Sequence, residues 1–231
     1  MMIDNEKRRF LQERLPAVEE KVRELLLSMP SCHDWDHTLR VRQNARVLAE
    51  AEQADTLLVD YAVLLHDIGR RQELEDQGKT CHAALGAAMA EQLLAQLGIE
   101  ALDFVDQVVA CVRTHRYRGR TGEKPASLEA KVVFDADKLD SLGAIGLARA
   151  FHFAGRIGAR VHNSHAEALN SKSYSQEDSA YREFLVKLRH LPKAMLTQSG
   201  RKIAERRYRL MESFFQNLNQ ECNGEDLDGL N

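Results

Sequence analysis

Apolar residues recur at helical spacing along most of this 231-residue chain. Between residues 90 and 97, alanine and leucine stand at i, i+3, i+4 and i+7, and the segments 102–112 and 204–218 repeat apolar residues at alternating steps of three and four. This spacing places an apolar stripe on one face of each helix, as helices packed around a shared core require. The alternation typical of strands is nearly absent. The sequence therefore predicts an all-α, single-domain, multi-helix bundle.

The same pattern gives the expected order of the elements. We expect an N-terminal helix within residues 1–27, the main domain over 28–220, and an acidic, disordered tail over 221–231. The polar stretches 116–125 and 157–178 are expected to be loops, and the length of the second favours a functional or mobile segment. The predicted helices span residues 4–29, 36–53, 56–68, 81–97, 100–115, 126–139, 141–156, 179–190 and 193–220.

Composition excludes several classes of protein. With 32 Lys and Arg against 35 Asp and Glu, the net charge of −3 does not suit a chain that coats nucleic acid or an anionic membrane. No apolar run is long enough to span a membrane, and residues 1–10 lack the apolar core of a secretory signal. The four cysteines are widely scattered and are interpreted as reduced thiols. We expect a soluble, cytoplasmic protein without membrane or nucleic-acid partners.

Histidine and aspartate gather at the ends of three predicted helices. The motif HDWDH spans residues 33–37, the pair His66-Asp67 ends an apolar run, and DADKLD spans residues 135–140. Neighbouring residues in mid-helix point about 100° apart, so His66 and Asp67 face one point only near a helix end. Gly69 follows the pair and would free the backbone there.

Two imidazoles and two carboxylates from these helix ends would form a site with two nitrogen and two oxygen donors. Such a donor set suits one divalent cation, with Mn²⁺ as our first choice and Mg²⁺, Co²⁺, Ni²⁺ or Fe²⁺ as alternatives, better than a sulfur-rich structural zinc site. The ion would lower the pKa of a water molecule and so provide a nucleophile near neutral pH. The candidate metal ligands are His37, His66, Asp67 and Asp137.

The order H…HD…D resembles that of the HD superfamily of metal-dependent phosphohydrolases, and longer segments resemble its YpgQ/YedJ-type group of small bacterial hydrolases. The resemblance covers roughly residues 28–220. It implies an all-helical fold, a divalent ion on the four residues named above, and cleavage of nucleoside triphosphates, especially deoxynucleotides, to monophosphate and pyrophosphate. The segments that carry it are HDWDHTLRV (33–41), LLHDIG (64–69), THRYRG (114–119), DADKLDSLGAIGLARAF (135–151) and KLRHLPKAM…SGRKIAERR (187–207).

Basic residues near the candidate ligands could neutralise phosphate charge. Arg40 lies three residues after His37, on the same helix face, and Lys138 directly follows Asp137. The loop after the predicted helix 100–115 carries further arginines. The predicted substrate-binding residues are His33, Arg40, Arg116, Arg118 and Lys138.

Four residues are predicted to take part in catalysis: His66, Asp67, His115 and Asp140. Asp140 could orient the attacking water or contact the sugar, and it could equally cap the helix that begins near Ser141. Asp34 could accept a hydrogen bond from a ligand imidazole.

The histidines at the ends of two further helices raise the possibility of a second ion. Some HD enzymes bind a second metal through two histidines between the doublet and the last aspartate, and His82 and His115 occupy such positions. His82 lies outside the segments of close resemblance, whereas His115 lies within one. We therefore favour one ion, with His115 as a substrate-facing or proton-transfer residue.

The leading hypothesis is a nucleoside triphosphate pyrophosphohydrolase. One alternative is an HD nucleotidase or phosphodiesterase that acts on monophosphates or cyclic nucleotides, and another is a non-catalytic nucleotide- or metal-binding module. The (p)ppGpp hydrolases of the superfamily carry acidic residues after the doublet, where this chain has Arg70 and Arg71. The sequence leaves open the base and sugar preference, the native metal and the oligomeric state, although the amphipathic C-terminal helix suggests a homodimer.

Overall fold

The computed structural model describes residues 5–27, 29, 33–76, 79–117 and 123–227. These residues form helices joined by loops, and no strand occurs among them, which confirms the all-α fold class. The chain divides into two compact units, Met1–Asp137 and Lys138–Asn231, with the boundary near the end of one helix.

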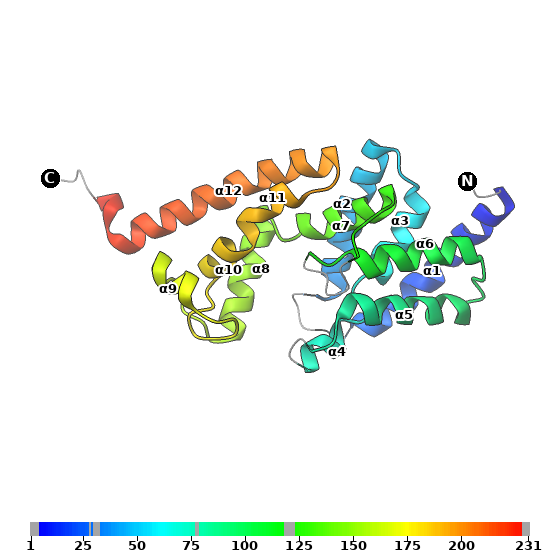
Figure 1. Ribbon diagram of the computed structural model, residues 1–231, viewed down its shortest axis with the longest axis horizontal. Helices are drawn as coiled ribbons and strands as arrows, with labels where there is room; N and C mark the ends of the chain where they lie inside the picture. Colours follow the sequence, from blue (N-terminus) through cyan, green and yellow to red (C-terminus); the bar gives the residue numbers. More distant parts are fainter. Residues whose placement is uncertain (1–4, 28, 30–32, 77–78, 118–122, 228–231) are drawn as a thin grey trace. The chain divides into compact units, whose positions relative to one another are not determined.

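The first unit is built around α3 (Thr56–Leu65), which packs against four other helices (Figure 1). Every residue from Leu57 to Leu65 is buried. The carboxylate of Asp55 accepts hydrogen bonds from two backbone amides of the first turn and so fixes where this apolar helix begins. Its neighbours are α1 (Asn5–Leu26), α2 (Trp35–Glu52), α5 (His82–Gln96) and α6 (Leu102–Thr114), and α4 (Arg70–Glu75) and α7 (Leu128–Leu139) complete the series.

An ion-pair network centred on the buried Asp60 joins the first three helices. Asp60 of α3 accepts from Arg42 at 3.1 Å and from Arg46 at 2.8 Å, and Arg42 also reaches Glu19 of α1 at 2.8 Å. Burial alone raises the pKa of the Asp60 carboxyl, but the hydrogen bonds and charges of the two arginines outweigh it and hold the pKa below its usual 3.8. The network therefore needs an ionised Asp60.

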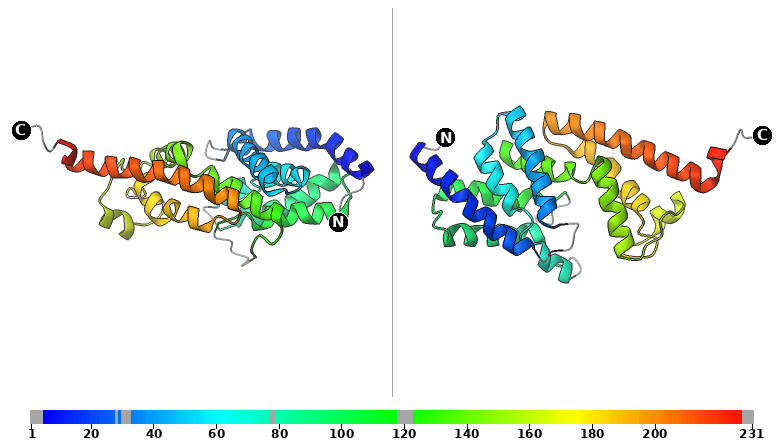
Figure 2. Two further views of the ribbon diagram at one scale, coloured as in Figure 1. Left: turned by 90° about the horizontal axis from the view of Figure 1, so that it is seen from above. Right: turned by 180° about the vertical axis from the view of Figure 1, so that it is seen from behind.

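The second unit is organised by its long C-terminal helix, α12 (Gln198–Asn223), which packs against α8 (Gly143–Arg156) and α11 (Leu191–Ala194) (Figure 2). Phe215 of α12 stacks on Phe184 with ring centroids 4.5 Å apart. The remaining elements are α9 (His165–Asn170), α10 (Ala180–Val186) and the 3₁₀ turns η1 (Leu188–His190) and η2 (Glu225–Leu227).

Several segments differ from the sequence-based expectation. The stretch 157–178 contains α9, where Ser164 and Glu167 form a reciprocal capping box. The helix expected to end at residue 220 continues to Asn223, where Gly224 with φ 72° ends it, so helical structure extends into the segment expected to be a disordered tail. Residues 228–231 of that segment lie outside the described residues.

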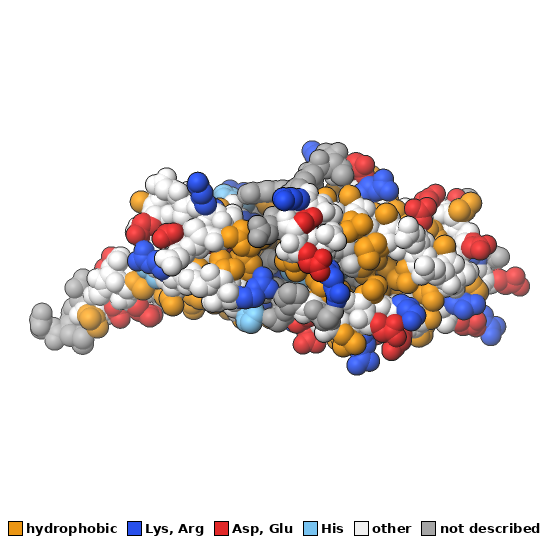
Figure 3. All heavy atoms as spheres, turned by 90° about the horizontal axis from the view of Figure 1, so that it is seen from below, with side chains coloured by type: hydrophobic (Ala, Val, Ile, Leu, Met, Phe, Trp, Pro, Cys, Tyr) orange, Lys and Arg blue, Asp and Glu red, His pale blue; other side chains and the backbone are white. Residues whose placement is uncertain are grey.

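On the face drawn in Figure 3, basic, acidic and apolar side chains are interspersed rather than separated by kind. Among the helices of the described residues, none combines the length and apolarity that a membrane span requires.

Candidate metal centre

His37 is placed by the start of α2. The carboxylate of Asp34 accepts a hydrogen bond from the backbone amide of His37 at 2.9 Å and is the N-cap of the helix. The structure shows Asp34 as a helix cap, and its hydrogen bond to a ligand imidazole stays a prediction. The cap fixes the first turn of α2. His37 lies in this turn, and its imidazole is fully buried.

His66 and Asp67 follow the last turn of α3. The Nδ1 atom of His66 donates to the carbonyl of Val63 at 2.7 Å, which fixes the tautomer and leaves the Nε2 lone pair facing inward. Gly69 lies two residues after Asp67, with φ −85° and ψ 0°, a conformation open to any residue. A Cβ at that position would lie 2.5 Å from the carbonyl oxygen of His82. The glycine therefore permits the close approach of α5 rather than freeing the backbone.

The structure brings the four predicted ligands together. The Nε2 atoms of His37 and His66 are 3.3 Å apart. His37 Nε2 lies 3.6 Å from Oδ2 of Asp67 and 3.6 Å from Oδ1 of Asp137. All four side chains are buried. We call this group half-site A: His37, His66, Asp67 and Asp137.

A second group lies on the other oxygen of Asp67. The Nε2 atoms of His82 and His115 are 3.1 Å apart, and each is 3.7 Å from Asp67 Oδ1. His115 donates from Nδ1 to the carbonyl of Val112 at 2.6 Å, the same arrangement that His66 has with Val63. We call this group half-site B: Asp67, His82 and His115.

Two arginines and a glutamate surround half-site B. Arg70 contacts Asp67 Oδ1 at 3.1 Å and Glu73 Oε2 at 2.6 Å, and Arg116 contacts Glu73 Oε1 at 2.6 Å. His82 donates from Nδ1 to Glu73 at 2.6 Å. Burial raises the pKa of Glu73, but His82 and the two arginines outweigh it and lower this pKa to about 2. Burial lowers the pKa of His82 to about 3, so this imidazole is neutral.

The donor set fits a divalent cation. Two nitrogen ligands bound at about 2.1 Å and meeting at a right angle lie about 3 Å apart, close to the 3.3 Å between His37 and His66. Because Nδ1 of His66 carries the proton, its Nε2 presents a lone pair. A bound cation would stabilise this lone pair, which faces the other nitrogen and oxygen ligand atoms. His37, His66 and Asp137 form one of the groups whose ligand atoms all lie within 4.8 Å of one another.

The other predicted residues of the first unit have varied surroundings. His33 contacts Asp67 Oδ2 through Nδ1 at 2.8 Å, and its side chain is 25% exposed. Arg40 is half-buried on α2. Arg116 is engaged with Glu73, and Arg118 lies outside the described residues.

Lys138 and Asp140 belong to the second unit, where both are buried. Asp140 accepts a hydrogen bond from Arg149 at 2.9 Å. The N-cap of α8 is Leu142, without a side-chain hydrogen bond, so the interpretation of Asp140 as the helix cap is wrong.

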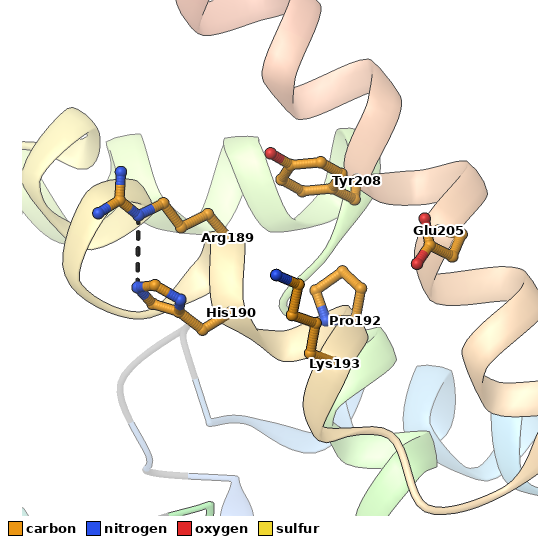
Figure 4. Close-up of a pocket in the computed structure, with 6 residues that line it drawn as sticks. All are labelled: Arg189, His190, Pro192, Lys193, Glu205 and Tyr208. Carbon is orange, nitrogen blue, oxygen red and sulfur yellow. Dashed lines mark hydrogen bonds between the residues drawn. The ribbon is translucent and has the colours of Figure 1, made fainter.

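The second unit also carries a surface pocket of about 320 Å³, lined by residues between Arg189 and Tyr208 (Figure 4). Arg189 donates from Nε to Nε2 of His190 at 3.3 Å, and Tyr208 donates to Glu212 at 2.7 Å. The pocket is lined by Arg189, His190, Pro192, Lys193, Glu205 and Tyr208.

Sequence reasoning missed the arginine–glutamate surroundings of half-site B. Asp67, Arg70 and Glu73 follow one another at steps of three, the spacing that aligns side chains on one helix face. That spacing was the available signal. It was hidden because the turn between α3 and α4 interrupts the expected helix 56–68.

An all-α fold in which helix ends present histidines and aspartates in the order H…HD…D is the arrangement of an HD domain. Residues 34–142 match the family model described as HD domain. The chain belongs to this family.

Among individual proteins, the chain is 34% identical over 207 residues to the uncharacterized protein YpgQ of Bacillus subtilis (strain 168). The aligned residues cover 90% of this chain and 93% of YpgQ. The crystal structure of B. subtilis YpgQ in complex with ADP superimposes with a TM-score of 0.70 at 30% identity, over 91% of this chain and 96% of the other. A predicted HD superfamily hydrolase from an uncultured Thermotogales bacterium gives a TM-score of 0.62 at 30% identity, over 89% and 91%.

Proposed function

We propose that this protein is a divalent-metal-dependent phosphohydrolase that cleaves nucleoside triphosphates, deoxynucleotides above all, to the monophosphate and pyrophosphate. The observation that carries the proposal is the buried meeting of two imidazoles and two carboxylates in half-site A. The structure of YpgQ with ADP supports a nucleotide as ligand. The HD superfamily hydrolases among the similar structures support hydrolysis.

Half-site A would hold the ion through Nε2 of His37, Nε2 of His66 and the carboxylates of Asp67 and Asp137. Mn²⁺ is the proposed ion, and Mg²⁺, Co²⁺, Ni²⁺ and Fe²⁺ suit the same donors. When bound, the ion supplies an activated water and polarises a phosphoryl oxygen.

The chain's own residues would bind and orient the triphosphate. Arg40 and Lys138 are proposed to neutralise charge on the phosphates, as in phosphoryl transfer generally. His33 is proposed to contact substrate through the edge that does not face Asp67. The arginines after α6, Arg116 and Arg118, are proposed to close the site over the phosphates.

Two further residues are proposed to act in proton transfer and orientation. His115 carries its proton at Nδ1, where it donates to Val112, so its Nε2 can accept a proton near Asp67. Asp140 is proposed to orient the attacking water through the carboxylate that Arg149 holds in place.

The proposed context is a cytoplasmic enzyme with a small-molecule nucleotide substrate, without nucleic acid, and able to form a homodimer. Among the described cysteines, Cys81, Cys111 and Cys222 are all free thiols, which supports a reducing compartment.

Two alternatives use the same centre. A nucleotidase or phosphodiesterase that acts on monophosphates or cyclic nucleotides needs the same ion and is also compatible with a relative that binds ADP. A non-catalytic binding module would be expected to lack at least one ligand, and the presence of all four ligands disfavours it.

A phosphate-release assay separates these functions. Metal-stripped protein is supplied with each divalent ion and each nucleoside or deoxynucleoside triphosphate, with and without inorganic pyrophosphatase. We expect phosphate only when pyrophosphatase is present, and none from Asp137→Asn. The exposed Asp36 provides a matched control, since Asp36→Asn changes the same charge next to a ligand and keeps activity. Phosphate without pyrophosphatase would identify a phosphatase, and no product from any triphosphate would contradict the proposal.

A further inference from the structure

We infer that Arg70, assisted by Arg116, restricts this centre to one tightly bound divalent ion by neutralising Asp67, the carboxylate that half-site B would offer to a second ion, and the neighbouring Glu73. The inference rests on the proposed metal-dependent function, because it assigns the number of ions that the same centre binds.

The two oxygens of Asp67 have different neighbours. Oδ2 faces two imidazoles, that of His33 at 2.8 Å and that of His37 at 3.6 Å. Oδ1 faces Arg70 at 3.1 Å, and the same oxygen is the one that lies 3.7 Å from His82 and His115. A second ion would therefore have to share an oxygen that a guanidinium already contacts.

The second carboxylate near half-site B is also neutralised. Glu73 meets Arg70 at 2.6 Å on one oxygen and Arg116 at 2.6 Å on the other. Two carboxylates in this part of the centre thus face two guanidiniums. Arg70 also acts electrostatically on Asp137 of half-site A, but its contact with Asp67 is through Oδ1, the oxygen of half-site B. The guanidinium contact on Asp67 therefore lies on the side of half-site B, although both half-sites present a pair of imidazole nitrogens.

Burial makes this difference effective. The side chain of Arg70 is 16% exposed and that of Asp67 is 1% exposed, so water screens their charges weakly. A guanidinium does not deprotonate in proteins and cannot yield to an incoming cation by losing its charge. A divalent ion on Asp67 Oδ1 would lie next to this fixed charge, and the repulsion would weaken its binding.

The test measures Mn²⁺ binding to the metal-stripped full chain by isothermal titration calorimetry and equilibrium dialysis. The wild-type protein is expected to bind one ion tightly and a second only weakly. Arg70→Gln is expected to bind the second ion at least about tenfold more tightly than the wild type does. Arg71→Gln removes the same charge from the next, exposed residue and is expected to behave as the wild type.

Two further variants locate the second ion and protect the test against misfolding. Adding His82→Asn to Arg70→Gln is expected to abolish the gain, because it removes one nitrogen of half-site B. Should Arg70→Gln lose its helical circular dichroism, Arg116→Gln replaces it in the test. The side chain of Arg116 is 23% exposed, and Arg116→Gln is expected to bind the second ion about threefold more tightly than the wild type does.

Each result decides the inference. Two ions of similar affinity in the wild type, or an unchanged second affinity in a folded Arg70→Gln, would overturn it. A gain that survives His82→Asn would also overturn it, because the second ion would then lie elsewhere. Absence of any Mn²⁺ binding in the wild type would instead remove the proposed metal centre itself, and with it both conclusions.

Discussion

His33 lies with Nδ1 2.8 Å from Oδ2 of Asp67, so a residue at the edge of the centre donates a hydrogen bond to one of its buried carboxylates. An ionised carboxylate only accepts, so the proton belongs to the imidazole. This bond fixes the carboxylate oxygen that half-site A would use. Under the proposed function, His33 would therefore act on the ion through Asp67.

The His33–Asp67 bond predicts a loss of metal affinity in His33→Ala. Residues that orient a ligand typically contribute about 10–100-fold to affinity, and we expect a loss within that range for Mn²⁺. Isothermal titration calorimetry on metal-stripped protein measures it. His165→Ala, which removes an exposed histidine of α9, serves as the control and should leave the affinity unchanged. Equal affinities of His33→Ala and the wild type would show that Asp67 does not depend on this bond.

Metal removal is expected to lower thermal stability. Half-site A buries two carboxylates beside two imidazoles, and an ion that binds only the folded chain stabilises it by mass action. At about a hundredfold excess over Kd, the gain is about 2.7 kcal/mol, which corresponds to an increase in Tm of roughly 5–10 °C for a chain of this size. Differential scanning calorimetry with Mn²⁺ and with a chelator measures the difference. Asp137→Asn should lose most of this shift, and an equal shift in that variant would place the ion elsewhere.

The Asp60 network predicts a stability loss in acid. The pKa of Asp60 is lowered below 3.8 in the folded chain, so the folded state binds this proton less readily than the unfolded state. The stabilisation is fully present above pH 3.8 and is lost as the pH falls through the folded-state pKa. In Asp60→Asn, urea unfolding at pH 7 should give a free energy lower by about 1.5–3 kcal/mol, since Arg42 loses one of its two carboxylate partners and keeps Glu19.

The difference in the free energy of unfolding between the wild type and Asp60→Asn should become smaller as the pH falls below 3.8, because the wild type then loses the stabilisation that the ionised Asp60 provides. Asp106→Asn, at an exposed position of α6, should keep wild-type stability at each pH. A gap that stays constant from pH 7 to pH 3 would show that the ionisation of Asp60 does not support the network.

The grouping of the four proposed ligands could be predicted from sequence because each of these residues lies near a helix end that hydrophobic periodicity can locate. His37 lies in the first turn of α2, His66 and Asp67 follow α3, and Asp137 lies near the end of α7. Two imidazoles and two carboxylates that lie close together are typical ligands of a divalent ion, so these residue types favour a metal site. The same periodicity gave the all-α class and most helix positions.

The surroundings of half-site B could not be predicted in this way. Arg70 and Glu73 lie in the short helix α4, which lacks a periodic apolar pattern of its own. Their role depends on α5 bringing His82 within 2.6 Å of Glu73, a contact between elements that spacing along the chain does not encode. The role of Gly69 was missed for the same reason, because its neighbour is the backbone of α5.

Gly69 provides the sharpest test of that contact between α4 and α5. In Gly69→Ala the new Cβ would lie 2.5 Å from the carbonyl oxygen of His82 and 2.6 Å from the amide nitrogen of Gly86, both backbone atoms that cannot rotate away. We expect the free energy of unfolding to fall by about 1–3 kcal/mol or more, together with weaker Mn²⁺ binding because His66 and Asp67 precede the strained turn. Gly86→Ala probes the same interface from the other side, where its Cβ would find neighbours only at 3.5 Å, an ordinary contact. Urea unfolding should therefore show a large loss of stability in Gly69→Ala and little change in Gly86→Ala. Equal losses of stability in the two variants would mean that the close approach of α5 is not the reason for a glycine at position 69.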